Sequence, residues 1–123
     1  MDQDIFFKIV KEKLYTYFSK KGFSKYKIYK GRRSAISFIK DTGEYQIPID
    51  IQWQGKINDE YMFAVYFVNI WIYEDDTKPN LNWIFTCEED LKKKLILFQE
   101  KSEQENFISK CEERAVTYFI VNE

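Results

Sequence analysis

The chain has 123 residues and a formal net charge of −1 at neutral pH, with 45% hydrophobic and 32% charged residues. This composition excludes a disordered or low-complexity protein, and the length fits one domain, residues 1–123, with a core of its own. The longest apolar run, residues 61–73, is shorter than the roughly 20 residues that a membrane-spanning helix needs, so no membrane association is expected.

Residues 3–21 are predicted to form the first helix, because their apolar residues recur at helical spacing and make one stripe. The stripe consists of Ile5, Phe6, Ile9, Val10, Leu14, Tyr17 and Phe18. Gly22 is expected to end the helix, since glycine adopts the left-handed conformation of a C-terminal cap without steric penalty. Phe23 follows at the position where such a cap makes an apolar contact.

Four strands are predicted next, at residues 25–30, 33–40, 46–54 and 61–73. Turn signals separate them at Gly31, at residues 41–44 and at residues 55–60. Apolar and polar residues alternate strictly in the third strand, as they do in a half-buried strand, and Pro48 places its start or part of it at an edge. The strands are expected to form an antiparallel meander.

The fourth predicted strand, residues 61–73, is apolar on both faces. Its even-numbered residues are mostly aliphatic, and we expect them to continue the isoleucine face of the third strand, on which helices pack. Its odd-numbered residues are mostly aromatic, and two interpretations stay open: helices cover them, or they are partly exposed and anchor a partner. In the second case the candidate partner-binding residues are Phe63, Phe67, Trp71, Tyr73, Asp50 and Gln52.

Two helices are predicted towards the C-terminal end. A capping-box pattern at Thr86 and Glu89 opens the first, and Ser102 with Glu105 opens the second. The predicted fold class is therefore α+β, with an N-terminal helix, a four-stranded antiparallel meander and two C-terminal helices.

Few residues are suited to catalysis. The chain has no histidine, which removes the commonest general base, histidine-dependent nucleophiles and most transition-metal sites. Its four glycines are scattered among turns and form no phosphate-binding loop. Cys87 near a helix start could be a reactive thiol, although an ordinary turn residue is the simpler interpretation. We therefore expect no catalytic residue, no metal and no cofactor, and we favour binding over enzymatic activity.

The N-terminal segment, residues 1–13, carries charges among its apolar residues and does not have the pattern of a signal peptide. The two cysteines, Cys87 and Cys111, form no closely spaced motif. We therefore expect a cytoplasmic protein with two reduced thiols.

Charge is unevenly distributed, because residues 20–40, here called the basic hairpin, contain eight basic residues and no acidic one. Bases interleaved with aromatic residues can bind phosphates and stack nucleobases. An alternative function is therefore binding of anions or single-stranded nucleic acid through Lys25, Lys27, Lys30, Arg32 and Arg33. A pI near 5.6 argues against a dedicated nucleic-acid binder. The lysines can also protect the hairpin edge from pairing with another chain.

The segments FFKIVKEKLYTYFSKKGFSKY and FAVYFVNIWIY make the chain similar to a group of small bacterial domains of unknown function. These domains open with an amphipathic helix, pass through a Lys-Gly-Phe boundary and continue into a meander that ends in a long aromatic strand. In size and composition they resemble the immunity proteins that neutralise secreted bacterial toxins. The resemblance implies binding of another protein without catalysis, and it supplies no catalytic residue.

The leading hypothesis is a non-enzymatic protein-binding domain of the immunity type, which binds and neutralises a toxin. Its expected partner is another protein; a homodimer is left open, and nucleic acid is the less favoured partner. Under this hypothesis, replacement of Trp71 and Phe67 by alanine leaves folding largely intact and weakens partner binding.

Overall fold

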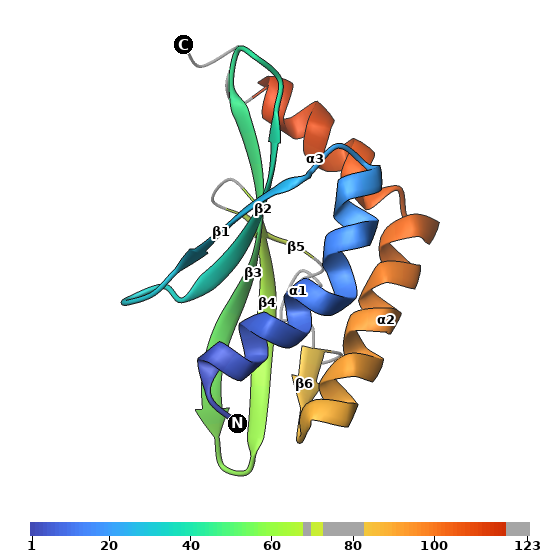
Figure 1. The fold of residues 1–123 in the computed structure, drawn as a ribbon. Helices are drawn as coiled ribbons and strands as arrows, with labels where there is room; N and C mark the ends of the chain where they lie inside the picture. The colour runs from blue at the N-terminus through green and yellow to red at the C-terminus, as the bar shows by residue number, and fades with distance from the viewer. Residues whose placement is uncertain (68–69, 73–82, 118–123) are drawn as a thin grey trace.

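The computed structural model describes residues 1–67, 70–72 and 83–117 (Figure 1). The elements are α1 (Gln3–Lys20), β1 (Lys25–Tyr29), β2 (Ala35–Asp41), β3 (Gln46–Ile57), β4 (Glu60–Phe67), β5 (Ile70–Ile72), β6 (Ile84–Phe85), α2 (Glu88–Gln104) and α3 (Phe107–Val116). The strands form one antiparallel sheet in the order β1-β2-β3-β4-β5, and β6 pairs with β4 as well. Helices α1, α2 and α3 lie on one face of the sheet (Figure 1). The predicted α+β class is confirmed.

Helix α1 begins and ends close to the predicted residues. The Asp2 carboxylate accepts a hydrogen bond from the backbone N–H of Ile5 at 2.9 Å, which caps the start of the helix. At the other end, the N–H of Phe23 donates to the carbonyl of Phe18 at 2.9 Å, and Gly22 has a φ of +95°. The rings of Phe18 and Phe23 are 6.3 Å apart between centroids. The predicted glycine cap and its apolar contact are therefore confirmed.

One hydrophobic core fills the space between the helices and the sheet. The ring of Phe6 lies within it, 5.2 Å from the Trp53 ring and 6.2 Å from the Phe63 ring between centroids. Helices α2 and α3 contribute Leu91, Leu95, Phe98, Phe107, Ile108, Cys111 and Ala115. The sequence stripe of α1 faces the same core, apart from Ile5, which is 38% exposed.

Residues 61–73 do not form one strand, contrary to the prediction. Strand β4 ends at Phe67, and β5 pairs back on it, with Phe67 opposite Ile70 and Val65 opposite Ile72. The chain therefore reverses between Phe67 and Ile70. The apolar pattern gave no sign of this reversal, because a buried hairpin and a single buried strand are apolar in the same way.

A β-bulge interrupts the ladder between β3 and β4. Near the tip of this hairpin Lys56 lies opposite Tyr61. Further along, Trp53 lies opposite Phe63, so β3 contains one residue more than β4 over this interval. Gly55 lies in the bulge with a φ of +84°, a conformation that glycine adopts without strain.

The bulge decides which face of β4 packs against the helices. A regular ladder continued from the hairpin tip would place Ile51 opposite Tyr66, but the extra residue shifts the register so that Ile51 lies opposite Val65. The odd-numbered residues of β4 therefore continue the isoleucine face of β3. The prediction that the even-numbered residues continue this isoleucine face is wrong, because it did not include the bulge in β3.

Both C-terminal helices are confirmed, but their predicted caps are wrong. Helix α2 begins after Cys87 instead of Thr86. Ser102 lies inside α2, where its hydroxyl forms a hydrogen bond with the hydroxyl of Tyr17 at 2.5 Å. Asn106, with a φ of +53°, precedes the first residue of α3. The hydroxyl of Ser102 thus has a partner distant in the sequence, which a local capping pattern cannot show.

Candidate functional site

Two of the four aromatic residues proposed as partner anchors, Phe63 and Phe67, are not available on the surface. Phe63 and Phe67 are each 1% exposed, because the bulge turns them towards the helices. Trp71 lies in β5 opposite Tyr66, and Tyr73 lies outside the described residues. For Phe63 and Phe67, coverage by helices is the interpretation that holds, so these two residues cannot act as anchors in this fold.

The other two candidates, Asp50 and Gln52, lie on the opposite face of the sheet, here called the helix-free face because none of the described helices packs on it. The strand register places Asp50 between Ser37 of β2 and Tyr66 of β4. Lys27 of β1 lies opposite Ser37 and therefore belongs to the same row. The residues predicted to form one partner-binding site are thus divided between the two faces of the sheet.

Asp50 is the least well satisfied acidic group among the described residues. Its Oδ1 atom is buried without a hydrogen-bond partner, and Gln52 beside it on the same strand face is 7% exposed. Burial raises the pKa of the Asp50 carboxyl, and a hydrogen bond from Ser37 partly offsets this effect. A carboxyl with a raised pKa in the folded state favours folding when it is protonated and opposes folding when it is ionised.

Replacement of Asp50 by asparagine is therefore expected to stabilise the protein at pH 7, by about 1 kcal/mol. The folded-state pKa of Asp50 is raised, so its contribution to stability is fully present below the unfolded pKa and is lost as the pH rises through the folded pKa. The difference between the two proteins should shrink as the pH is lowered towards 4, roughly the unfolded pKa of an aspartate. Urea unfolding at a series of pH values measures it; a destabilised variant at pH 7 would contradict the assignment.

The five bases proposed for anion binding, Lys25, Lys27, Lys30, Arg32 and Arg33, are all exposed. They lie on β1 and on the turn that leads into β2. Every residue of β1 is exposed, and among the described residues only β2 pairs with this strand. The basic hairpin therefore presents its charges on an outer edge of the molecule.

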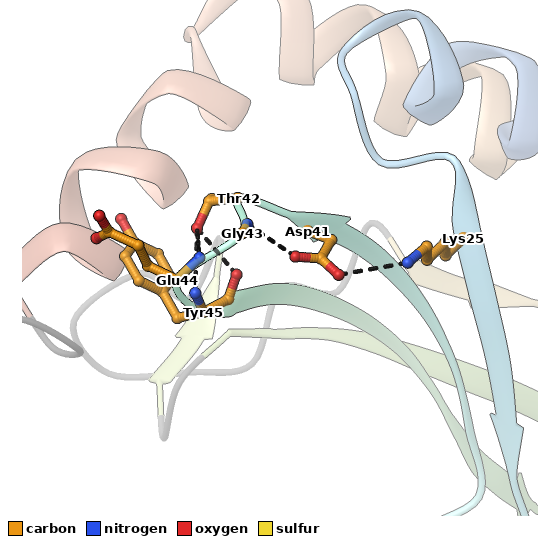
Figure 2. A network of polar contacts seen from close by, with 6 residues as sticks. All are labelled: Lys25, Asp41, Thr42, Gly43, Glu44 and Tyr45. Atoms are coloured by element: carbon orange, nitrogen blue, oxygen red, sulfur yellow. Dashed lines mark hydrogen bonds and ion pairs between the residues drawn. The ribbon is translucent and has the colours of Figure 1, made fainter.

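Intramolecular contacts engage these bases to different degrees. Lys25 forms an ion pair with Asp41 at 3.3 Å (Figure 2), and Lys30 forms one with Asp4 at 2.7 Å. Lys27, Arg32 and Arg33, in contrast, have no carboxylate within ion-pair distance among the described residues. No ion pair therefore competes with an external anion at these three cations, although Lys27 lies over the Tyr29 ring at 5.2 Å and Arg33 over the Tyr66 ring at 5.9 Å from the ring centres.

The turn between β2 and β3 holds Asp41 beside Lys25 (Figure 2). Asp41 Oδ1 accepts a hydrogen bond from the backbone N–H of Gly43 at 2.9 Å, while its Oδ2 faces the Lys25 ammonium. The Gly43 N–H first, and Lys25 second, lower the pKa of the Asp41 carboxyl. Asp41 therefore stays ionised and keeps Lys25 at the end of β1 near this turn.

Exposed apolar side chains accompany the bases. Tyr26, Ile28 and Tyr29 are 40%, 41% and 44% exposed, respectively. The rings of Tyr15 and Tyr26 meet edge to face at 6.0 Å between centroids, and Lys11 lies 4.5 Å above the Tyr26 ring. The sequence prediction considered the aromatic residues of this segment but missed Ile28, whose alternation with lysines on an edge strand was the available signal.

The cysteines lie in contrasting environments. Cys87 is exposed at the N-terminus of α2, and its side chain caps no backbone N–H. Cys111 faces the core, where burial raises the pKa of its thiol to about 12. Among the described residues, no group of three or more acidic or cysteine side chains is arranged to hold a metal ion.

No match to this chain is found among protein-family models, curated proteins or solved structures. Of the helices that the structure describes, none combines the length and the apolar character needed to cross a membrane. The site must therefore be interpreted from its own chemistry, and its best-defined feature is the exposed edge of the basic hairpin.

Proposed function

We propose that the chain is a non-enzymatic protein-binding domain that binds an acidic partner on the basic hairpin. The observation that carries this proposal is the joint exposure of the five bases and of Tyr26, Ile28 and Tyr29 on one edge of the sheet. Arginine and aromatic residues beside one another are enriched in protein interfaces, where they contribute much of the binding energy.

Charge complementarity favours an acidic partner. Residues 20–40 contain eight bases and no acid, whereas residues 41–123 contain eight bases and seventeen acids. An acidic partner is attracted to the hairpin and repelled by the rest of the molecule, which selects one docking orientation. Neutralisation of a toxin, which the resemblance implies, is one form of such binding; in that case the toxin supplies the acidic contact surface.

A second candidate function is binding of single-stranded nucleic acid by the same hairpin. It is favoured by the exposure of Tyr26 and Tyr29 next to lysine side chains, an arrangement that can stack bases. Against it, Lys11 lies above the Tyr26 ring and Lys27 lies 5.2 Å from the centre of the Tyr29 ring, so each tyrosine already has a cation over one face. We therefore rank protein binding first.

Fluorescence anisotropy with two labelled probes, a glutamate-rich peptide and an oligothymidine of equal charge, tests the proposal. We expect the peptide to bind at low salt and to lose affinity as salt is added. Reversal of the charge at Lys27, Arg32 and Arg33 to glutamate should weaken peptide binding by about tenfold or more, since three attractive contacts become repulsive.

The matched control reverses the charge at Lys13, Lys93 and Lys110, which are exposed on the helices. This variant has the same net charge as the hairpin variant and should bind the peptide within about twofold of the parent protein. Absence of peptide binding at low salt would overturn the proposal, and tighter binding of the oligothymidine would favour the second candidate.

A further inference from the structure

Strand β1 has a free outer edge among the described residues. It is five residues long, and its only partner there is β2, with Lys25 opposite Ile39 and Tyr29 opposite Ala35. In an antiparallel pair, the backbone N–H and C=O groups of every second residue point away from the partner strand. These groups on β1 are available to pair with another strand, which is the situation that natural sheets usually prevent or use for recognition.

The side chains of β1 alternate between the two faces of the sheet: both lysines share one face with Tyr29, and the other face carries only uncharged side chains of this strand. Lys25 and Lys27 lie on the helix-free face, since Lys27 lies opposite Ser37. Tyr26 and Ile28 lie on the helix side, where their register partners Phe38 and Ile36 belong to the core. A strand added to this edge would therefore meet positive charge on one face and exposed apolar surface on the other.

A second copy of the chain is a poor occupant for this edge. If two β1 strands paired antiparallel about their common centre, Lys27 would lie directly opposite the Lys27 of the other copy. Like charges opposite each other destabilise a strand pair. The absence of any acidic residue from residues 20–40 leaves nothing to offset this repulsion within the hairpin.

We propose that β1 binds its partner by strand addition, with an extended segment of another protein in which acidic residues alternate with apolar ones. The acidic side chains lie beside Lys27 and compete with Asp41 for Lys25, and the apolar side chains lie beside Tyr26 and Ile28. Backbone hydrogen bonds to the free edge supply affinity, and the alternation supplies specificity. This inference rests on the proposed function, since it specifies how the acidic partner is bound.

A short peptide in which glutamate alternates with valine, capped at both ends, serves as the probe. Its matched control has the same sequence with methylated backbone nitrogens, which keeps every carboxylate but removes the donors that strand pairing needs. Amide hydrogen exchange of the protein is followed by NMR with each peptide. We expect the outward-pointing amides of β1 to exchange at least tenfold more slowly with the unmethylated peptide, and methylation to weaken binding by at least tenfold.

On the protein side, Lys27→Glu should weaken binding of the unmethylated peptide by about fivefold or more, because an attractive cross-strand pair becomes repulsive. Lys93→Glu, which makes the same charge change at an exposed position of α2, should leave it nearly unchanged. Both substitutions are at exposed positions, and the unbound amide-exchange pattern of each variant shows whether its fold is retained.

The outcomes separate this inference from the proposed function. Equal binding of both peptides without slower exchange in β1 would overturn strand addition and leave acidic-partner binding intact. Failure of both peptides to bind at low salt would overturn the two together. Slower exchange in β1 with rising protein concentration, in the absence of peptide, would show that a second copy occupies the edge and would also overturn the inference.

Discussion

Replacement of Phe6 by alanine is expected to lower the free energy of unfolding by about 3–5 kcal/mol, the usual cost of truncating a buried phenylalanine. Phe6 is 0% exposed. Its ring lies 5.4 Å from the ring of Phe7 and 5.9 Å from that of Phe85 between centroids, in addition to its contacts with β3 and β4. The truncation thus leaves a cavity where α1 meets the sheet. Urea unfolding followed by circular dichroism measures the change.

The control for Phe6 is Ile5→Ala on the same helix. Ile5 is 38% exposed, so its truncation removes little buried surface, and alanine has the higher helix propensity. We expect a change in the free energy of unfolding below about 0.5 kcal/mol. Equal effects at the two positions would show that α1 does not pack on the sheet through the face described above.

Replacement of Phe67 by alanine is also expected to cost about 3–5 kcal/mol of stability. Phe67 is 1% exposed and shares a sheet face with Val65, which lies opposite Ile51. The leading hypothesis from the sequence led to the opposite expectation: a variant that lacks the Phe67 ring stays folded and only binds its partner more weakly. The melting temperature and the urea midpoint of the isolated protein distinguish the two expectations without any knowledge of the partner.

Tyr29→Ala is the matched aromatic truncation for Phe67, because it also removes a ring from a strand. Tyr29 is 44% exposed, and we expect its loss to change the free energy of unfolding by less than about 1 kcal/mol. A stable Phe67→Ala protein beside a destabilised Tyr29→Ala protein would mean that the faces of the sheet are assigned the wrong way round.

Local signals account for the parts of the fold that were predicted correctly. The stripe of α1, the glycine at position 22 and the alternation in β3 each specify a structure within a few residues of themselves. The helix–meander–helices order follows from these elements, and the structure confirms it. Such features can be predicted because no distant contact is needed to produce them.

The errors arise where distant contacts decide the structure. Between Phe67 and Ile70 the sequence contains neither glycine nor proline, and Asn69 alone is a weak marker for a reversal of the chain. Ser102 matches a capping pattern, but it lies inside α2 and its hydroxyl bonds to Tyr17 of α1 instead of to a backbone N–H. The split of the candidate partner site has a similar origin, because the face of Phe63 depends on a bulge in the opposite strand, in which one residue of β3 is left unpaired.

The prediction of the basic hairpin depended on composition alone. A run of bases without acids can be read from any sequence, and the structure places all five candidate residues on the surface. Which of them remain unpaired could not be predicted, because Asp4 and Asp41 are distant from Lys30 and Lys25 along the chain. The free edge of β1 likewise depends on strand order, which composition does not determine.

The extra residue at Gly55 has a consequence for how homologous chains can differ in length. If Gly55 were deleted, one residue would separate Trp53 from Lys56 in β3, as one residue separates Phe63 from Tyr61 in β4. The two parts of the β3–β4 ladder would then join into a regular ladder, and the same side chains of β4 would face the helices. Loss or gain of a residue nearer the middle of β3 would exchange the inner and outer sides of everything that follows. Insertions and deletions that evolution retains in this hairpin should therefore cluster at its tip.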